Sequence, residues 1–447
     1  MDKSKIVKLH HALNCLTLFQ GITEDKAIQH LNKIISTIMA KDVSSPVDLL
    51  VDYHKLIGIL LKETVDPQLP KVGNPWQNHF LNQVLFNDNL YAREFVARQS
   101  LISTVEEAFL HDLRKLQVIC LEGMQILEDF FGQTPGVFPA TTNPLPNTPG
   151  NHPLSDLLME LKQKLLSGES WSDQLAAFKT FYQAAGFGQF ALYRAFRWEP
   201  GPAGFHLAGI EKPDPIRLQQ LIGYERQRKQ VLSNTERLLN GQGAHHLLLY
   251  GDRGTGKSST VKALLHAYGP KGLRLVQVSR QNLAGLQSLS RYLIKVPLKF
   301  IIFIDDLSFE ESETDYKEFK TQLEGSLEQQ PANVCIYVTS NQRNLVKEYF
   351  SDRHTKVVDG EVHTGDTLQE KLSLADRFGI KITYMAPDKE AFLEIVRQLA
   401  LQEKLNIDEP TLERLALKWV LWHNERSGRT ARQFIDHIKG RDDLDIF

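Results

Sequence analysis

The chain has 447 residues, long enough for more than one core, and its formal net charge of −2 gives no basic field to attract nucleic acid or an anionic membrane. Its three cysteines, Cys15, Cys120 and Cys335, show no metal-ligand spacing, so we expect free thiols in a reducing compartment. The apolar run Phe300–Ile304 is too short to cross a bilayer, and the N-terminus lacks the apolar core of a signal peptide. These features predict a cytoplasmic protein, and they argue against membrane and nucleic acid as partners.

The first part of the chain is predicted to be α-helical. Apolar residues recur at intervals of three and four in segments such as 27–35 and 113–121. We therefore expect a helical N-terminal region over residues 1–131, a proline- and glycine-rich linker over 132–153, and a helical connector over 154–213. These segments hold no catalytic constellation, so we expect their helices to bind a protein partner that the sequence does not identify.

The connector is predicted to contain two helices, Leu154–Leu166 and Gln174–Phe196. A second break rich in proline and glycine follows, from Trp198 through Gly204 to Pro215. We expect irregular chain there, before the next domain.

From Leu221 onward, short apolar runs alternate with helical segments, a pattern typical of a parallel sheet covered by helices on both faces. We predict an α/β domain with a five-stranded parallel sheet over residues 214–387 and a helical lid over residues 388–447. The expected strands are Leu247–Tyr250, Leu273–Val278, Phe300–Asp305, Val334–Thr339 and Lys381–Tyr384. The expected helices are Tyr224–Leu239, Ser258–Tyr268, Leu283–Ile294, Tyr316–Glu328 and Leu345–Phe350, with Lys389–Glu403, Glu409–Trp422 and Thr430–Lys439 in the lid.

The run Gly251–Ser258, directly after an apolar strand, matches the phosphate-binding pattern G-x-x-x-x-G-K-[ST] at every required position. Backbone N–H groups of such a loop converge on phosphate oxygens at a helix N-terminus. We expect Lys257 to reach the β- and γ-phosphates and the Ser258 hydroxyl to bind Mg²⁺. The alternative, a turn that caps an ordinary helix, leaves the preceding strand without a role. ATP and Mg²⁺ are thus the predicted ligands, and the predicted loop residues are Gly251, Asp252, Arg253, Gly254, Thr255, Gly256, Lys257, Ser258 and Ser259.

Polar residues follow two further predicted strands. Asp305 and Asp306 end the apolar run at the sheet edge where α/β proteins bind ligands. We expect Asp305 to hold the Mg²⁺ shell and Asp306 to orient the attacking water; the alternative is an acidic turn before a helix. Asn341 ends the next strand and could contact the γ-phosphate or the water, although asparagine is also a common turn former.

Two arginines complete the candidate set. Arg377 precedes the last strand, and Arg429 opens the last lid helix. Arginine suits a triphosphate because it stays protonated and offers a forked set of donors. Since most arginines are solvated surface residues, spacing alone leaves both roles open.

Taken together, residues 221–439 resemble the AAA+ ATPases, P-loop NTPases with an α/β core, a helical lid and ring assembly. The resemblance implies that Gly251–Ser258 is Walker A, that Asp305 and Asp306 form Walker B, and that Asn341 is sensor 1. It further implies that Arg377 is a finger for a neighbouring subunit of a homo-oligomer and that Arg429 is sensor 2. Gly223 and Tyr224 lie in a segment that resembles the one lining the adenine pocket.

The motifs Gly-Asp-Arg-Gly-Thr-Gly-Lys-Ser-Ser, Ile-Asp-Asp-Leu-Ser-Phe-Glu, Thr-Ser-Asn and Leu-Ala-Asp-Arg-Phe-Gly are more narrowly similar to a bacterial AAA+ group, the domain-of-unknown-function 815 family. One departure is that Walker B usually ends Asp-Glu, whereas here it ends Asp305-Asp306. Glu310 or Glu311 could substitute, and slow turnover is expected either way. A second departure is that Gln281–Leu286 stands where an aromatic polypeptide-threading loop would lie.

Three functions therefore stay open. The first is an ATPase that remodels or loads a macromolecular partner. The second is a slow, nucleotide-gated signalling or scaffold switch. The third is a loader associated with nucleic acid, for which the balanced charge gives no support.

Overall fold

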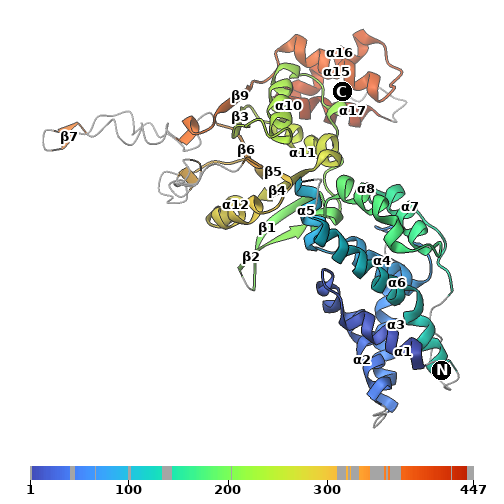
Figure 1. Ribbon diagram of the computed structural model, residues 1–447. Coiled ribbons are helices and arrows are strands. Elements are labelled where there is room, and N and C mark those ends of the chain that lie inside the picture. The colour runs from blue at the N-terminus through green and yellow to red at the C-terminus, as the bar shows by residue number, and fades with distance from the viewer. Residues whose placement is uncertain are drawn as a thin grey trace. The chain divides into compact units, whose positions relative to one another are not determined.

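A computed structural model of the chain describes residues 3–40, 46–65, 67–98, 102–132, 143–202, 204–309, 319–320, 323, 332–342, 357–358, 361–362, 374–423 and 425–439. The chain divides into two compact units, Met1–Leu192 and Tyr193–Phe447, and each is considered by itself (Figure 1). In the described part of the chain, no helix combines the length and the apolar character needed to cross a membrane.

The first unit is helical, as predicted. Its longest helix, α6, runs for 29 residues and packs against α1, α4 and α5. Apolar residues at helical spacing on α6, among them Phe109, Leu113 and Leu116, are fully buried. The helices are α1 (Lys3–Asn14), α2 (Lys26–Ala40), α3 (Pro46–Thr64), α4 (Pro75–Leu85), α5 (Leu90–Arg98), α6 (Ser103–Phe131), α7 (Ser155–Leu166), α8 (Leu175–Ala185) and α9 (Gly188–Leu192), with short 3-10 turns at Gln20–Glu24 and Trp171–Gln174.

A buried ionic cluster ties several of these helices together. The imidazole of His79, on α4, lies 2.9 Å from Asp25 through Nε2 and 2.7 Å from Glu63 through Nδ1. Burial alone would lower the pKa of His79, but hydrogen bonding to the two carboxylates raises it to about 9. His79 is therefore held as a cation between two anions.

Only part of the predicted linker is visible, because residues 133–142 lie outside the described residues. From residue 143 to 153 the chain forms no helix and only one isolated bridge, between Lys71 and Thr148. The Leu145 amide also donates to the Gly73 carbonyl at 2.7 Å. This part of the predicted linker is therefore irregular, but it lies along residues 67–73 of its own unit.

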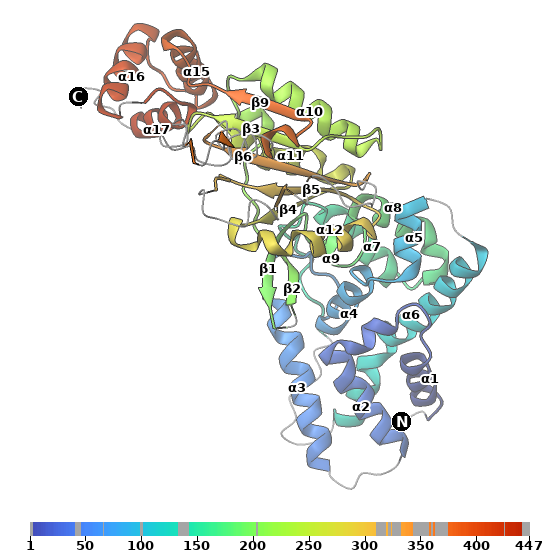
Figure 2. The same cartoon turned by 90° about the vertical axis from the view of Figure 1, so that its left-hand side faces the viewer.

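The second unit contains a seven-stranded, mostly parallel sheet in the order β2-β1-β4-β5-β6-β3-β9. The strands are β1 (Ala195–Gly201), β2 (Gly204–Gly209), β3 (Leu247–Gly251), β4 (Leu273–Val278), β5 (Lys299–Ile304), β6 (Val334–Ser340) and β9 (Ile380–Tyr384). Five of them are the predicted strands, which confirms the α/β core (Figure 2). A separate two-stranded sheet joins β7 (Val357–Val358) to β8 (Glu361–Val362).

The prediction of five strands was wrong in number, because β1 and β2 extend one edge of the sheet. They form an antiparallel hairpin that turns at Gly204, whose φ of 108° favours glycine. This hairpin replaces the irregular chain expected from Trp198 to Gly209, whereas residues 210–215 form neither helix nor strand, as expected. The helix expected over Gln174–Phe196 was also too long: α8 ends at Ala185, before Gly186 with its φ of 85°, and β1 begins at Ala195.

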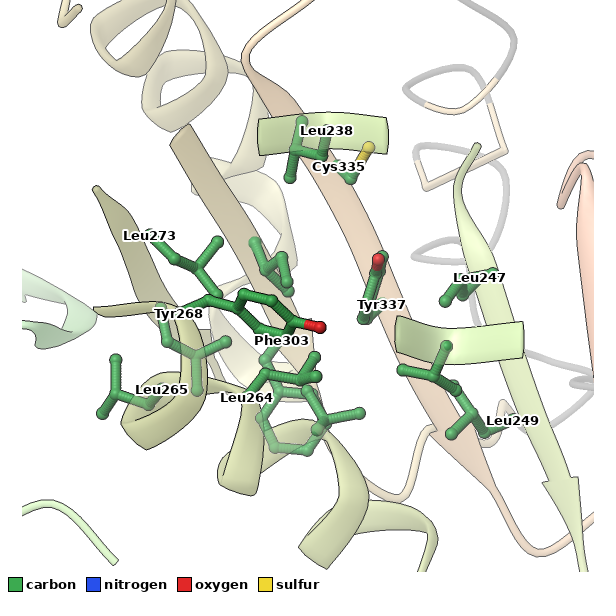
Figure 3. Close-up of a cluster of buried hydrophobic side chains, with 14 of the residues drawn as sticks. Leu238, Leu247, Leu249, Leu264, Leu265, Tyr268, Leu273, Phe303, Cys335 and Tyr337 are labelled. Carbon is green, nitrogen blue, oxygen red and sulfur yellow. The ribbon is translucent and has the colours of Figure 1, made fainter. Parts of the chain in front are cut away.

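Helices cover the sheet and fix the loop that follows β3. They are α10 (Glu225–Leu239), α11 (Lys257–Tyr268) and α12 (Leu286–Ile294). Figure 3 shows Leu247 and Leu249 of β3 in one buried cluster with Leu264 and Leu265 of α11. The predicted helices Tyr316–Glu328 and Leu345–Phe350 lie largely or wholly outside the described residues.

The Tyr337 hydroxyl links β6 to α10. It accepts a hydrogen bond from Asn234 Nδ2 at 3.0 Å and lies 2.9 Å from Thr235 Oγ1. All three residues are buried, so these contacts satisfy polar groups inside the core.

The helical lid is present as predicted, with α15 (Lys389–Gln402), α16 (Glu409–His423) and α17 (Gly428–Ile438). Side-chain caps start two of these helices: Asp388 accepts from the Ala391 amide, and Ser427 accepts from the Thr430 amide. The three helices enclose their own apolar cluster, which includes Phe392, Val396, Leu415, Phe434 and Ile435.

Candidate nucleotide-binding site

The loop between β3 and α11 has a backbone that requires glycine. Gly251, Gly254 and Gly256 have φ values of 128°, 69° and 90°. A Cβ on Gly251 would overlap the Tyr384 carbonyl oxygen of the neighbouring strand, and one on Gly254 would lie 2.5 Å from Ser427 Oγ. The loop is thus pressed between β9 and the lid, while α11 begins directly behind it at Lys257. This places the open N-terminus of a 12-residue helix at the loop.

The Lys257 side chain folds back over this loop. Its ammonium group donates to the carbonyl oxygens of Gly251 at 2.8 Å and Asp252 at 2.6 Å, and only 6% of the residue is exposed. Burial lowers the pKa of Lys257, although Asp252, Asp306 and Asp305 oppose this effect. The side chain therefore presents a weakly solvated cation next to the glycine-rich turn.

Asp305 is held by two hydroxyl groups. Ser258 Oγ and Thr339 Oγ1 donate to the same carboxylate oxygen of Asp305, at 2.5 and 2.6 Å. The β5–β6 register explains this contact, because Ile304 pairs with Val338, so the next residues along each strand face one another. A hydroxyl and a carboxylate side by side are oxygen ligands of the kind that Mg²⁺ takes when substrate phosphates supply the rest. Ser258 and Asp305 therefore fit the predicted metal role.

The neighbouring residue Asp306 has a left-handed backbone, with a φ of 51°. Its amide donates to Thr339 Oγ1 at 2.9 Å, which fixes the peptide that turns the chain. Asn341 Nδ2 donates to the Asp306 carboxylate at 2.5 Å. Asp306 thus lies exposed beyond the strand end, with its carboxylate oriented by Asn341.

The lid contacts the loop through its backbone. The Arg429 amide donates to the Gly254 carbonyl at 3.1 Å, and Ser427 packs against the same glycine. Arg429 and Arg432 both line the pocket described below, and Arg432 pairs with Glu403 at 2.8 Å. The first turn of α17 therefore brings cationic side chains to the loop.

Opposite the phosphate loop, the segment before α10 supplies an apolar wall. Tyr224 takes a left-handed conformation, its ring lies 5.2 Å from that of Tyr384, and its hydroxyl donates to the Met385 carbonyl at 2.7 Å. Burial raises the pKa of Tyr224 to about 12, so the phenol stays protonated. The apolar side chains that line this part of the pocket are Ile216, Leu221, Ile222, Ile395 and Leu399.

These groups surround one pocket of about 700 Å³, within the size range of small-molecule sites. The predicted site residues that line it are Tyr224, Arg253, Gly254, Thr255, Gly256, Lys257, Ser258, Ser259, Asp305, Asp306, Asn341 and Arg429. Gly223, Gly251, Asp252 and Arg377 are not among its lining residues. Gly251 and Asp252 shape the loop from behind, and Arg377 lies exposed in the turn before β9. Glu310 and Glu311, the substitutes considered for Asp306, lie outside the described residues.

Thr339 is the functional residue that the sequence reasoning missed. It was expected only as the end of a strand, yet its hydroxyl bonds to Asp305 and to the Asp306 amide. Its position two residues before Asn341 is a signal that could have found it, because alternate residues of a strand share a face.

No curated protein is detectably similar to the chain in sequence. Similar solved structures include the RuvB Holliday junction branch migration motor of Thermotoga maritima, with 14% identity and a TM-score of 0.30, over 51% of this chain and 74% of that one. AMPPCP-bound DnaA from Aquifex aeolicus has 18% identity and a TM-score of 0.36, over 51% of this chain and 67% of that one. The profile of a family described as "Protein of unknown function (DUF815)" matches residues 191–442, more than half of the chain. The resemblance found in the motifs is thereby confirmed, and the chain belongs to the DUF815 family.

Proposed function

We propose that this chain binds ATP with Mg²⁺ in the 700 Å³ pocket and hydrolyses it. One observation carries the proposal: the phosphate loop, the Asp305 oxygen cluster and the Asp306–Asn341 pair all line that pocket together with Arg429. A turn that only capped a helix would need neither a buried lysine nor two carboxylates at the end of strand β5.

Each residue has a role that its geometry supports. Backbone N–H groups at the start of α11 and the Lys257 ammonium would bind the phosphates, exchanging the loop carbonyls for phosphate oxygens. Ser258 and Asp305 would hold Mg²⁺, which supplies charge neutralisation between the β- and γ-phosphates. Asp306, oriented by Asn341, would position the attacking water, and Arg429 would neutralise phosphate charge from the lid.

A slow, nucleotide-gated switch is the second candidate, and the Walker B ending favours it. The Asp306 side chain is one methylene shorter than glutamate, and its carboxylate already accepts a 2.5 Å hydrogen bond from Asn341. Both features restrict how far that carboxylate can reach toward a water molecule. An ATPase with this site would turn over slowly and spend most of its time with nucleotide bound.

The wider biological role rests on the chain's organisation. We propose that the helices of Met1–Leu192 engage a protein partner, that Tyr193–Phe447 acts as a cytoplasmic, homo-oligomeric ATPase unit, and that Arg377 serves the site of a neighbouring subunit. Its exposed position outside the pocket of its own chain is compatible with that role. The coupled process would be remodelling or loading of the partner. Salt-dependent retention on DNA would instead favour the nucleic-acid loader.

The proposal is tested with three variants measured for ATP affinity, turnover and melting temperature. Lys257→Ala should remove binding without unfolding the protein, because it deletes the charge proposed to bind phosphate and two hydrogen bonds within the loop, but no contact of the hydrophobic core. Asp305→Asn should weaken the Mg²⁺-dependent part of binding, whereas Asp306→Asn should bind ATP normally and stop turnover.

Unchanged affinity and turnover in folded Lys257→Ala would refute the assignment of the loop. Turnover that survives Asp306→Asn but stops in Glu310→Gln or Glu311→Gln would show that another carboxylate positions the water.

A further inference from the structure

Helix α3 of the first unit has two apolar faces, although one face is enough to hold it in place. The inner face buries Leu49, Tyr53, Leu56 and Leu60 against neighbouring helices. Asp52, also buried, accepts from Lys33 Nζ at 2.6 Å and lies 3.0 Å from His30 Nδ1. The helix is therefore fixed from the inside, and its outer apolar residues need another explanation.

The outer face carries a regular stripe at intervals of 4, 3, 4, 3 and 4 residues, the heptad spacing of a coiled-coil seam. Its apolar members are unusually open, with 66% of Val47, 45% of Val51, 42% of Leu61 and 78% of Val65 exposed. The stripe spans about 27 Å of helix. We call it the α3 seam, and it consists of Val47, Val51, His54, Gly58, Leu61 and Val65.

The α3 seam is complementary to itself when reversed. An antiparallel copy would place Val47 opposite Val65, Val51 opposite Leu61, and His54 opposite Gly58. A Cβ built on Gly58 meets no atom within 4 Å, so there is open space in front of that residue for an imidazole from the other copy. A parallel copy would instead set Gly58 against Gly58, which leaves a gap, and His54 against His54, which crowds two imidazole rings together.

Charges beside the seam favour the same orientation. The outer flank carries Asp48, Lys55 and Lys62, all exposed, whereas the opposite flank is uncharged and includes the buried Ile57. In an antiparallel pair the charged flank faces its own copy, which brings Asp48 near Lys62 twice and Lys55 near Lys55 once. In a parallel pair the charged flank would face the uncharged flank of the other copy, so no ion pair would form. Two attractive pairs against one repulsive pair select the antiparallel arrangement.

We infer that the α3 seam is a self-association surface on which a second copy of this chain docks, antiparallel and related by a two-fold axis near residue 56. The contact would be isologous, since the same patch serves both copies. It uses no residue that lines the nucleotide pocket and does not depend on the proposed ATPase activity. A two-helix contact of this length is at the small end of specific interfaces, so association should depend on protein concentration.

The test introduces charges at Val51 and Leu61, which face each other across the proposed antiparallel pair. The molar mass is then measured by light scattering and sedimentation without added nucleotide. Wild type should approach twice the 50.9 kDa of one chain as concentration rises. Val51→Lys combined with Leu61→Lys should lose this association, because each layer then holds two cations. Val51→Lys combined with Leu61→Glu should regain it, because each introduced lysine would face an introduced glutamate of the other copy only in the antiparallel register.

Val7→Lys is the matched control, because Val7 is 53% exposed in the same unit but lies on α1, away from the seam. It should associate like wild type, and all variants should melt like wild type. A second readout mixes His54→Cys with Gly58→Cys in a Cys15→Ser background, which leaves only buried native thiols. A short thiol cross-linker should then join the two variants to each other in preference to either with itself.

Monomeric wild type at every concentration would overturn the inference, as would association that persists in the doubly cationic variant. If that variant dissociates and the lysine–glutamate variant does not recover, the antiparallel register is wrong. An oligomer formed only by another surface, including the proposed ATPase assembly, would overturn the inference in the same way, because none of these substitutions would change its mass.

Discussion

The most informative single substitution at the pocket is Thr339→Val, which removes one hydroxyl and preserves the shape of the side chain. Thr339 is 1% exposed, and its hydroxyl makes two hydrogen bonds at once. It donates to the Asp305 carboxylate at 2.6 Å and accepts from the Asp306 amide at 2.9 Å. The substitution therefore removes one of the hydrogen bonds that hold each aspartate, without opening a cavity.

The magnitude follows from the two bonds. A hydrogen bond to a charged group contributes about 1.5–3 kcal/mol and a neutral one about 0.5–1.5 kcal/mol, so Thr339→Val should lower the free energy of unfolding by about 2–4 kcal/mol. The effect on catalysis should fall on kcat, because Asp306 loses the contact that fixes its left-handed peptide. If half of that energy positions the reacting groups, kcat drops by about 5- to 30-fold. The phosphate loop is untouched, so any rise in KM should be confined to the Mg²⁺-dependent part of binding that Asp305 is proposed to support.

The assay pairs urea unfolding with steady-state ATP turnover, and Thr339→Ser is the control because it keeps the hydroxyl. Thr339→Ser should retain most of the stability and of kcat. The reasoning fails if Thr339→Val hydrolyses ATP at the wild-type rate, or if Thr339→Ser is impaired as much as Thr339→Val. A loss of stability alone would mean that Thr339 only supports the strand.

Three further predictions concern the loop, the oligomer and the first unit. Gly254→Ala should weaken ATP binding in calorimetry while the protein still folds, because the new Cβ would lie 2.5 Å from Ser427 Oγ and the residue has a φ of 69°; normal affinity would contradict this. Arg377→Ala should be nearly inactive because an arginine finger supplies about 10³–10⁵ in rate, and Lys257→Ala should be nearly inactive because it lacks a working phosphate loop. When the two variants are mixed, some interfaces combine an intact loop with an intact Arg377, so activity should partly return. No recovery in co-assembled mixtures would place Arg377 outside a neighbour's site. The pKa of His79 is raised from 6.5 to about 9, so its cation stabilises the fold fully below pH 6.5, and about 3 kcal/mol should be lost as pH rises through 9. Urea unfolding from pH 7 to 10 should show this decline in wild type but not in His79→Gln. If the free energy of unfolding falls equally with pH in both proteins, His79 is not the group responsible.

Local patterns were enough to predict the α/β core because most of its strands are short apolar runs in the sequence, and helices follow β3 and β4. The β1–β2 hairpin escaped prediction for a physical reason. Its Pro200, Gly201 and Gly204 are the residues that usually interrupt regular structure, and β1 is held in the sheet by β4, which begins at Leu273. A strand stabilised by a partner so far along the chain carries little signal in its own sequence.

In the candidate site, too, some residues could be predicted from the local sequence and others could not. Lys257 and Ser258 could be assigned from a contiguous motif, and Asp305 from the end of a buried strand. The role of Thr339 could not, because it depends on the register between β5 and β6, which brings Thr339 opposite Asp305. Local sequence thus identifies the residues that would touch the nucleotide and its metal, whereas strand pairing determines which side chains hold those residues in place.

The contact between lid and loop bears on how a bound nucleotide would be sensed. The bond from the Arg429 amide to the Gly254 carbonyl joins the first turn of α17 to the loop through backbone atoms, and Ser427 both caps α17 and packs on the same glycine. A phosphate that reoriented the Gly254 peptide would therefore shift the start of α17 directly, without any side chain having to change rotamer. That coupling depends on binding and not on hydrolysis, so it serves a motor and a slow switch equally. The two proposed functions consequently differ in how fast the bound state ends. If Asp306 positions the water as proposed, the turnover of Asp306→Glu compared with wild type decides between them.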